Sequence, residues 1–287
     1  MASNTREIRR RIKSVKNIGQ ITKAMELVSA AKMRKAQNSA LSSRPYSRIA
    51  SELMKNVMAK AGSTNHPLLN RPQSGAGRKL IILITSDKGL AGSLNTNAVN
   101  TALRLARQEG GKANFDFLTV GKKGTDVAKR LGFNIIATLP SRDKDVTIFD
   151  AKAVAQIAIQ DYLSEKYDRV YVVYTDFIST LSQKSNVFTL LPLYTEQANN
   201  SDEYLFEPGA DSILEKLIAR SIEFSVYQAL VESVASEHSA RMVAMRNANQ
   251  AAGDLIDDLQ LFYNQARQAG ITRELAEISA AKLAMEG

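Results

Sequence analysis

A chain of 287 residues, 44% of them hydrophobic, is long enough for one large domain or two modest ones and apolar enough for a packed core. It contains no cysteine, which excludes disulfides, thiol catalysis and cysteine–zinc sites, and its only histidines are His66 and His238. The formal net charge is +9, and all of the basic excess lies in the first 60 residues, where 14 lysines and arginines accompany three glutamates.

The first segment, residues 1–60, is expected to be one long helix whose partner is acidic. Its apolar residues recur at steps of three and four, which predicts that they share one helix face. Those residues are Ile8, Ile12, Val15, Ile18, Ile21, Met25 and Val28. Pro45 predicts a kink, and residues 61–77 are interpreted as a linker rich in turn-forming residues. The concentrated positive charge predicts binding to nucleic acid, anionic lipid or an acidic protein surface.

The middle segment, residues 78–205, alternates strand and helix patterns. The expected strands are Lys79–Thr85, Phe115–Val120, Asn134–Leu139, Val170–Thr175 and Val187–Tyr194, and the expected helices are 97–109, 122–131 and 148–166. Strands that alternate with helices indicate a mainly parallel sheet covered on both faces, hence an α/β fold. No helix precedes the last strand, so we expect that strand to pair antiparallel.

The last segment, residues 206–287, is expected to be a second long helix, beginning at Pro208 and running to the end of the chain. Such a helix would be roughly 115 Å long, whereas a compact chain of this length has a radius of gyration near 19 Å. It must therefore project from the α/β domain. The two long helices are expected to pair antiparallel, and the last one should extend alone by about 30 Å.

The sequence offers little support for enzyme activity. The loop Ser86–Asn95 follows the first strand, where a phosphate loop would lie, but neither it nor Gly121–Gly124 matches a phosphate-binding glycine spacing. We therefore interpret Ser86–Asn95 as a tight turn with a helix cap, and expect no catalytic residue, cofactor or metal site. Two alternatives stay open at this point: a coiled-coil nucleic-acid-binding protein with an α/β head, and a nucleotide enzyme with helical arms.

Two long motifs resemble those of one family. Residues 21–35, ITKAMELVSAAKMRK, are similar to the N-terminal signature of ATP synthase gamma subunits, and residues 235–245 and 261–278 are similar to the C-terminal signature. The resemblance implies a long antiparallel coiled coil joined to a Rossmann-like α/β domain. It further implies a non-catalytic central rotor shaft that couples a proton- or sodium-driven membrane ring to ATP synthesis by alpha and beta subunits. The partners would be those subunits, the epsilon subunit and the c-ring, with no nucleic acid.

The resemblance also implies a location and a set of contact residues. The complex would lie at the bacterial inner membrane, with this chain peripheral on the cytoplasmic side. The beta subunit would be contacted by Lys23, Met25, Lys32, Lys35, Arg267, Gln268 and Thr272. An apolar sleeve would receive the tip residues Ile271, Leu275, Ile278, Leu283 and Met285. The membrane ring and epsilon would be contacted by Glu203, Tyr204, Phe206 and Glu207.

Overall fold

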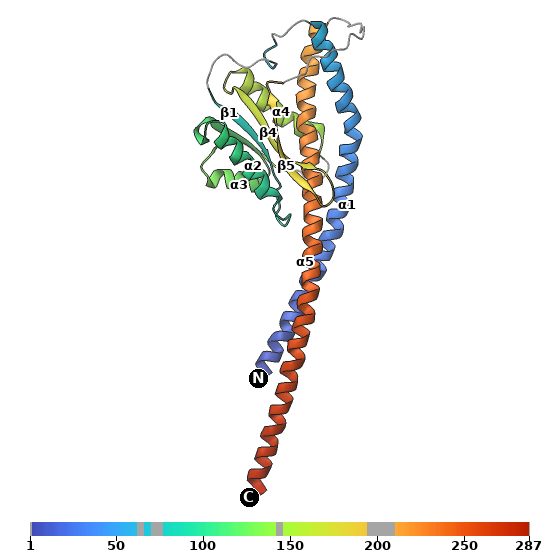
Figure 1. Cartoon of the computed structure of the whole chain (residues 1–287), viewed down its shortest axis with the longest axis vertical. Coiled ribbons are helices and arrows are strands. Elements are labelled where there is room, and N and C mark those ends of the chain that lie inside the picture. Colours follow the sequence, from blue (N-terminus) through green and yellow to red (C-terminus); the bar gives the residue numbers. More distant parts are fainter. Residues whose placement is uncertain (1, 62–65, 70–76, 142–145, 194–209, 287) are drawn as a thin grey trace. The chain divides into compact units, whose positions relative to one another are not determined.

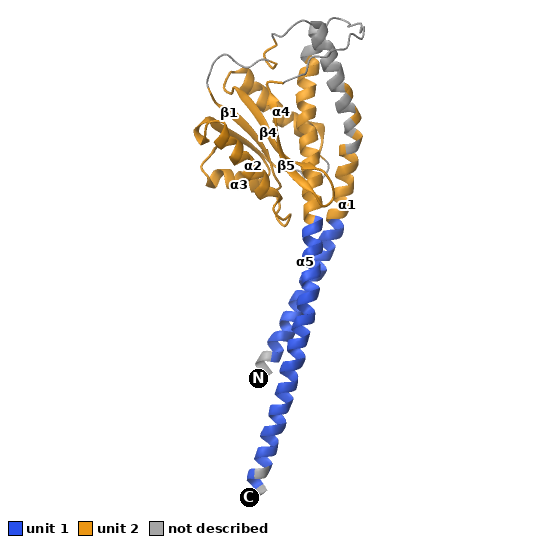
Figure 2. Cartoon of the chain, viewed as in Figure 1, with its two compact units in different colours: residues 1–28, 242–287 blue, residues 29–241 orange. Residues whose placement is uncertain are grey.

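The computed structural model describes residues 2–61, 66–69, 77–141, 146–193 and 210–286. The chain divides into two compact units (Figure 2): unit 1 comprises residues 1–28 and 242–287, and unit 2 comprises residues 29–241. Helix α1 (Ala2–Ala61) and helix α5 (Ala210–Glu286) each contribute residues to both units. Both terminal segments are therefore long helices, as the sequence predicted, and the assignment of α1 is continuous through Pro45.

Unit 2 is built on a five-stranded sheet (Figure 1). The strands are β1 (Lys79–Ile84), β2 (Phe115–Val120), β3 (Asn134–Leu139), β4 (Arg169–Phe177) and β5 (Gln183–Leu191), in the order β3-β2-β1-β4-β5. The remaining helices are α2 (Leu94–Gln108), the short 3₁₀ helix η1 (Lys112–Asn114), α3 (Lys122–Arg130) and α4 (Ile148–Leu163). The pairs among β1 to β4 are parallel, and β5 pairs antiparallel with β4. The expected α/β fold with an antiparallel last strand is confirmed.

Alternate residues of β1 face two separate cores. Ile81 and Leu83 pack with α2, whereas Leu80, Ile82 and Ile84 pack with α4 and α5. A strand that is buried on both faces has a continuous run of apolar residues. Because Lys79–Ile84 has such a run, it could be predicted from the sequence. The portion of α5 in unit 2 is therefore part of the domain core.

A network of hydrogen bonds centred on a buried carboxylate connects the amino-terminal ends of neighbouring strands in unit 2. The Asp116 carboxylate, which is buried, accepts two hydrogen bonds from Arg78 at 2.6 and 2.7 Å, one from Asn134 at 2.9 Å and one from Tyr167 Oη at 2.8 Å. Burial alone would raise the pKa of Asp116, but these hydrogen bonds and the charge of Arg78 lower it below its ordinary value. Burial, together with the hydrogen bond to Asp116, raises the pKa of Tyr167 far above that of a free tyrosine.

Unit 1 is a two-stranded antiparallel coiled coil of α1 and α5. Buried and partly buried positions on α1 are spaced alternately four and three residues apart: Ile8, Ile12, Val15, Gly19, Thr22 and Glu26. The same spacing on α5 gives Ala252, Ile256, Leu259, Tyr263, Ala266 and Gly270. A period of 3.5 residues keeps each row facing its partner in a left-handed supercoil.

Contacts between the two rows fix their direction. A Cβ added to Gly19 would lie 3.6 Å from Ala252 Cβ. The guanidinium of Arg9 donates to Tyr263 Oη and lies 5.3 Å from the centre of that ring. Rising numbers on α1 therefore meet falling numbers on α5, as expected for an antiparallel pair.

The prediction that the apolar residues of α1 share one face was partly wrong. Ile18, Ile21 and Val28 are exposed, Ile21 to 59%, and do not belong to the row that faces α5. Ile18 and Ile21 each precede a member of the heptad row by one residue, and Val28 precedes the buried Ser29, so each is turned about 100° around the helix from a buried position. The row itself continues through Gly19 and Thr22, because small side chains allow the two backbones to approach closely.

Candidate partner-binding surfaces

The end of α5 carries an uncovered apolar stripe. From Ile271 to Met285 every described side chain is exposed; that of Leu283 lies outside the description. Ile271, Leu275, Ile278 and Met285 are spaced by four, three and seven residues, so they share one helix face. Leu275 is 60% exposed. A contiguous apolar face of this kind indicates a contact surface for another molecule.

Three polar residues predicted to contact a partner lie on α5 beside the start of this stripe. Arg267, Gln268 and Thr272 are all exposed. Arg267 precedes Ile271 by four residues, and Gln268 precedes Thr272 by four, so these side chains cover neighbouring turns of one helix face. The structure thus brings the predicted hydrogen-bonding residues and the first tip residue together. The guanidinium, amide and hydroxyl groups can donate hydrogen bonds to a partner carbonyl or carboxylate.

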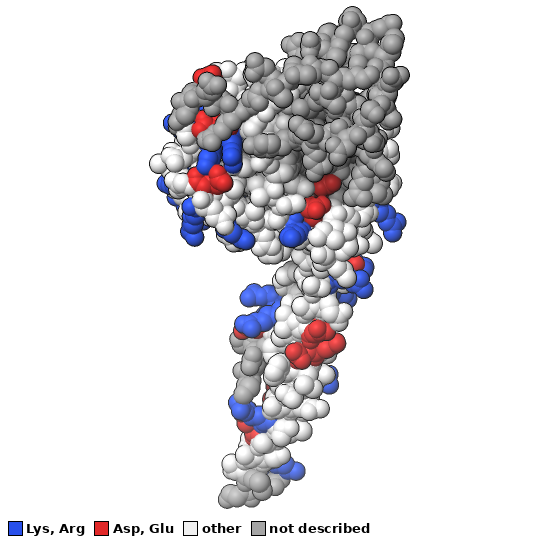
Figure 3. Space-filling model, turned by 45° about the horizontal axis from the view of Figure 1, so that its top comes forward, with Lys and Arg blue, Asp and Glu red and all other residues white. Residues whose placement is uncertain are grey.

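The basic segment of α1 presents its charge to solvent. In unit 1, α1 carries the seven exposed cations Arg6, Arg9, Arg10, Arg11, Lys13, Lys16 and Lys23. Figure 3 shows basic side chains recurring along this unit with acidic ones among them. Lys23 pairs with Glu26 at 3.0 Å, an exposed ion pair that adds little stability. The other predicted contact residues of α1 differ in exposure: Met25 and Lys32 are partly buried, and Lys35 is exposed.

The predicted ring and epsilon contacts, Glu203, Tyr204, Phe206 and Glu207, lie outside the described residues.

Further exposed apolar residues on both long helices were not predicted from the sequence. Ile18, Ile21 and Val28 of α1 were assigned to the buried face, and Leu27 was not singled out. On α5 the exposed residues Leu255, Leu261 and Phe262 were also not selected. A helical apolar period alone does not distinguish the face that meets α5 from a face that meets another protein. The distinction required the pairing of the two helices.

The loop after β1 is fixed by contacts rather than open for phosphate. Its two ends are joined by Ser86 and Asn95, whose side chains hydrogen-bond at 2.8 Å. The buried guanidinium of Arg241 on α5 donates to the carbonyl oxygen of Gly89 at 3.2 Å and to Glu237 Oε1 at 2.6 Å. The tight turn is as expected, but the expected helix cap is not formed by the Ser93 side chain, which accepts a hydrogen bond from the Asn97 side chain at 3.2 Å instead of from a backbone N–H.

Two kinds of site are missing from the described part of the chain. Its residues include no group of three or more histidines, aspartates or glutamates placed to hold a metal ion. None of its helices combines the length and apolar character needed to cross a bilayer.

Comparison with known proteins identifies the family. A family model described as ATP synthase matches residues 4–285. The ATP synthase gamma chain of Pelotomaculum thermopropionicum is 43% identical over 286 residues, covering 98% of this chain and 99% of the relative. That of Coxiella burnetii (strain RSA 493) is 40% identical over 289 residues, covering 99% of this chain and all of the relative.

Solved structures agree with this identification. A chain of the central stalk and c-ring assembly of the Tetrahymena thermophila mitochondrial ATP synthase matches with a TM-score of 0.60 and 27% identity, over 79% of this chain and 99% of that one. A chain from the Euglena gracilis mitochondrial enzyme, at 21% identity, shows the same fold with a TM-score of 0.69 over 99% of this chain and 95% of that one. On the full-length sequence match and this fold, the chain belongs to the ATP synthase gamma-chain family, whose members are non-catalytic subunits of the complex.

Proposed function

We propose that this chain, a central shaft of a rotary ATP synthase, transmits rotation to catalytic sites formed by alpha and beta subunits through the exposed end of α5 and the basic segment of α1. The observation that carries the proposal is the stretch 271–285 of α5, where every described side chain is exposed. An isolated apolar helix face in water is unfavourable by about 25 cal/mol per Å², so this end requires a partner.

The chemistry of the tip suits a rotating contact. Ile271, Leu275, Ile278 and Met285 present aliphatic and thioether groups that make no directional hydrogen bonds. Leu283 falls in the same stretch of sequence, and we include it. A sleeve of alpha and beta subunits that is also apolar could cover this face in many orientations at similar free energy. Rotation would then meet low barriers at the tip.

Directional contacts are proposed for the adjacent polar residues and for α1. Arg267, Gln268 and Thr272 would hydrogen-bond the beta subunit in particular rotational states. Lys23, Met25, Lys32 and Lys35 would meet an acidic loop of beta, which the positive charge of α1 would attract. Because contacts made in one orientation are absent in another, each beta subunit would be biased toward a different nucleotide affinity.

At its other end the shaft is proposed to meet the membrane ring and the epsilon subunit through Glu203, Tyr204, Phe206 and Glu207. The chain would then lie peripherally on the cytoplasmic side of a bacterial inner membrane, with protons or sodium ions as the coupling ion. The division of the sequence into residues 1–60, 61–77, 78–205 and 206–287 also stays a prediction, in which the third segment is the foot that carries these contacts.

Reconstitution of the catalytic complex tests the proposal. The chain would be mixed with cognate alpha and beta subunits, and ATP hydrolysis measured with each component omitted in turn. We expect sustained, cooperative hydrolysis only when this chain is present, and no hydrolysis by the chain alone. A chain that neither assembles with these subunits nor changes their activity would refute the proposed function.

Variants of two surfaces sharpen the test. Arg267→Ala should lower coupled turnover by about tenfold or more with assembly intact, because a charged hydrogen bond contributes about 1.5–3 kcal/mol and each 1.4 kcal/mol is a factor of ten. Arg246→Ala is the matched control, since Arg246 is another exposed arginine of α5. The double variant Lys32→Glu and Lys35→Glu should weaken the interaction with beta most at low salt. Equal turnover for Arg267→Ala and its control would remove Arg267 from the contact set.

A further inference from the structure

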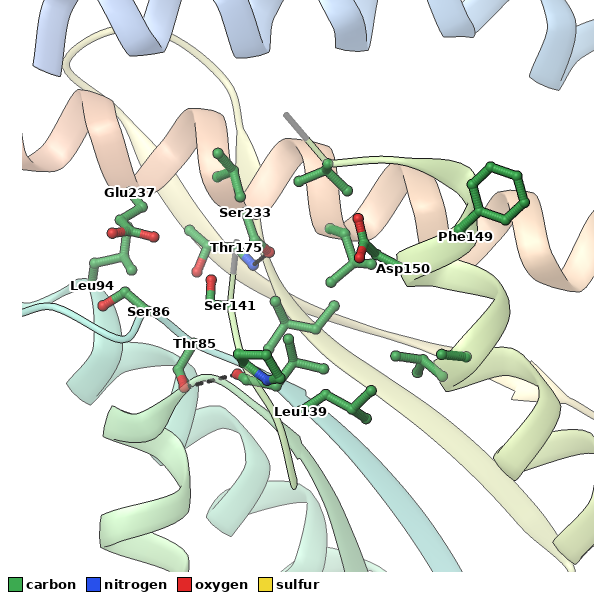
Figure 4. A pocket seen from close by; sticks show the side chains of 18 residues that line it. Thr85, Ser86, Leu94, Leu139, Ser141, Phe149, Asp150, Thr175, Ser233 and Glu237 are labelled. Atoms are coloured by element: carbon green, nitrogen blue, oxygen red, sulfur yellow. Dashed lines mark hydrogen bonds between the residues drawn. The ribbon is translucent and has the colours of Figure 1, made fainter. Parts of the chain in front are cut away.

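A cavity of about 320 Å³ with a largely apolar wall lies within unit 2, at the carboxyl-terminal ends of the parallel strands. Figure 4 shows side chains that surround it, contributed by the strand ends, by α4 and by α5. The aliphatic and aromatic part of its wall includes Ile84, Val120, Leu139, Phe149, Val154 and Leu230. The volume falls within the range typical of small-molecule sites.

The cavity occupies the position where α/β folds bind ligands. The chain passes from β1 to β2 to β3 in one direction and then returns to place β4 on the opposite side of β1. The connections therefore diverge between β1 and β4, and the crevice outside such a switch point is the usual ligand site of an open parallel sheet. Ile84, the last residue of β1, lines the cavity.

Hydroxyl groups of the wall are bonded within the protein. Thr85 Oγ1 accepts a hydrogen bond from the Gly124 N–H at 2.8 Å. Ser233 Oγ accepts one from the Thr175 N–H at 3.2 Å. A polar ligand gains little from groups that already have partners, because it would have to replace hydrogen bonds that hold the fold.

Both carboxylates of the described wall are also held by the protein. Glu237 pairs with the buried Arg241 at 2.6 Å, so the two charges offset each other. Asp150 caps α4, since its Oδ2 accepts hydrogen bonds from the Thr147 N–H at 2.9 Å and from the Thr147 hydroxyl at 2.8 Å. A charged ligand would exchange its water for mainly apolar contacts, which is unfavourable.

The chain segment between two lining residues, Ser141 and Val146, is chemically unsuited to fill the cavity. It lies outside the described residues and consists of Arg142, Asp143, Lys144 and Asp145. Charged side chains are seldom buried against apolar groups. The two positive and two negative charges also offset each other, so the segment gives the cavity no net preference for a cation or an anion.

We infer that this cavity binds a small neutral molecule with an aromatic ring system. A dry apolar cavity of about 150 Å³ holds benzene, so a cavity of about 320 Å³ has room for a compound of two fused rings. The rings would lie against Leu139, Val154 and Leu230, with Phe149, which is 76% exposed, at the mouth. This site is independent of the shaft function, so its failure would leave the proposed function unaffected.

Calorimetric titration of the full-length chain tests the inference. The probes share one ring system: indole is neutral, tryptamine is a cation and indole-3-propionate is an anion. We expect saturable one-to-one binding of indole and affinities at least about tenfold weaker for both ions, because each ion would lose hydration on entering the cavity. No indole binding, or binding of either ion as tight as that of indole, would overturn the inference.

Variants locate the binding in the cavity. Ala153→Phe fills the space from α4 and should abolish indole binding, whereas Gln156→Phe, at an exposed position of the same helix that does not line the cavity, should not. Phe149→Ala removes an exposed ring, so the fold should be unchanged while indole affinity falls about fivefold. Leu163→Ala, at an exposed site at the other end of α4, is its control.

The Phe149→Ala variant decides the matter if Ala153→Phe fails to fold. Wild-type indole affinity in Phe149→Ala, or an equal loss in Leu163→Ala, would refute the assignment of the site.

Discussion

Two regions of the same helix, α5, are helical for different reasons. In unit 2, Ile218, Ile222 and Val226 are completely buried in the core beside the sheet. At the other end, in unit 1, residues 271–285 have only exposed side chains among those described. That stretch is rich in alanine, leucine and glutamate, which favour helix without tertiary contacts. Core packing stabilises the unit 2 part of α5, whereas intrinsic helix propensity stabilises residues 271–285. Only residues 271–285 therefore have side chains free to bind a partner.

The largest effect is expected from placing a charge in each region. Ile222→Asp buries an unpaired carboxylate in the core, at a cost of more than about 4 kcal/mol, and should prevent unit 2 from folding. Leu275→Asp should change the free energy of unfolding by no more than about 0.5 kcal/mol, because the site is exposed. Circular dichroism and denaturant titration measure both. A folded Ile222→Asp, or an unfolded Leu275→Asp, would reverse the comparison.

The next largest effect is expected from removing one partner of a buried ion pair. Arg241 and Glu237 form a buried ion pair on the unit 2 part of α5. Arg241→Met should cost about 3–5 kcal/mol, because it leaves the Glu237 carboxylate buried without its cation. The double variant Arg241→Met and Glu237→Met should recover much of this loss. If the double variant is as unstable as the single one, the cost arises from lost packing instead.

A smaller and pH-dependent effect is expected at Asp116. Its pKa is lowered in the folded state, so the ionised carboxylate stabilises the fold above its ordinary pKa, and this contribution is lost as the pH falls below about 4. Asp116→Asn should cost about 1–3 kcal/mol at neutral pH and less in acid. Unfolding titrations at several pH values measure the difference. A cost that stays constant from pH 6 to pH 2.5 would contradict this assignment.

The smallest effect is expected in unit 1, where the coiled coil contains glycine. Gly19→Ala should stabilise the unit by about 0.5–1 kcal/mol, because alanine loses less backbone entropy and its Cβ would lie at ordinary contact distance from Ala252. Gly253→Ala is the control, since no atom lies within 4 Å of the added Cβ. Thermal unfolding followed by circular dichroism measures both. A destabilised Gly19→Ala with a stabilised control would show that the helices approach more closely there.

The sheet could be predicted from the sequence because its signals are local. Lys79–Ile84 and Phe115–Val120 are short apolar runs between turn residues, and strands of this kind buried on both faces need no knowledge of the rest of the chain. The antiparallel direction of β5 could be predicted because its connection to β4 is too short to contain a helix. Only the strand and helix ends differed, by a few residues, since turn geometry rather than hydrophobicity sets them.

The faces of the long helices could be predicted less well. The α1 row that meets α5 includes Gly19 and Thr22, which a search for apolar residues passes over. Ile18 and Ile21 were consequently assigned to the interior, although they are exposed. The proposed contact residues, such as Arg267, were predicted from resemblance to a family, because an exposed arginine carries no local signal of whether it meets a partner. The ion pair between Arg241 and Glu237 was also missed, since nothing in the sequence shows that both are buried.

Direct observation of rotation tests the central claim. The chain has no cysteine, so Gln108→Cys at an exposed position of α2 gives a single labelling site for a bead. The labelled chain would be assembled with cognate alpha and beta subunits fixed to a surface, and the bead followed during ATP hydrolysis. We predict stepwise rotation in one direction that requires ATP. Continued hydrolysis with a bead that does not turn would contradict the account of this chain as a rotor shaft.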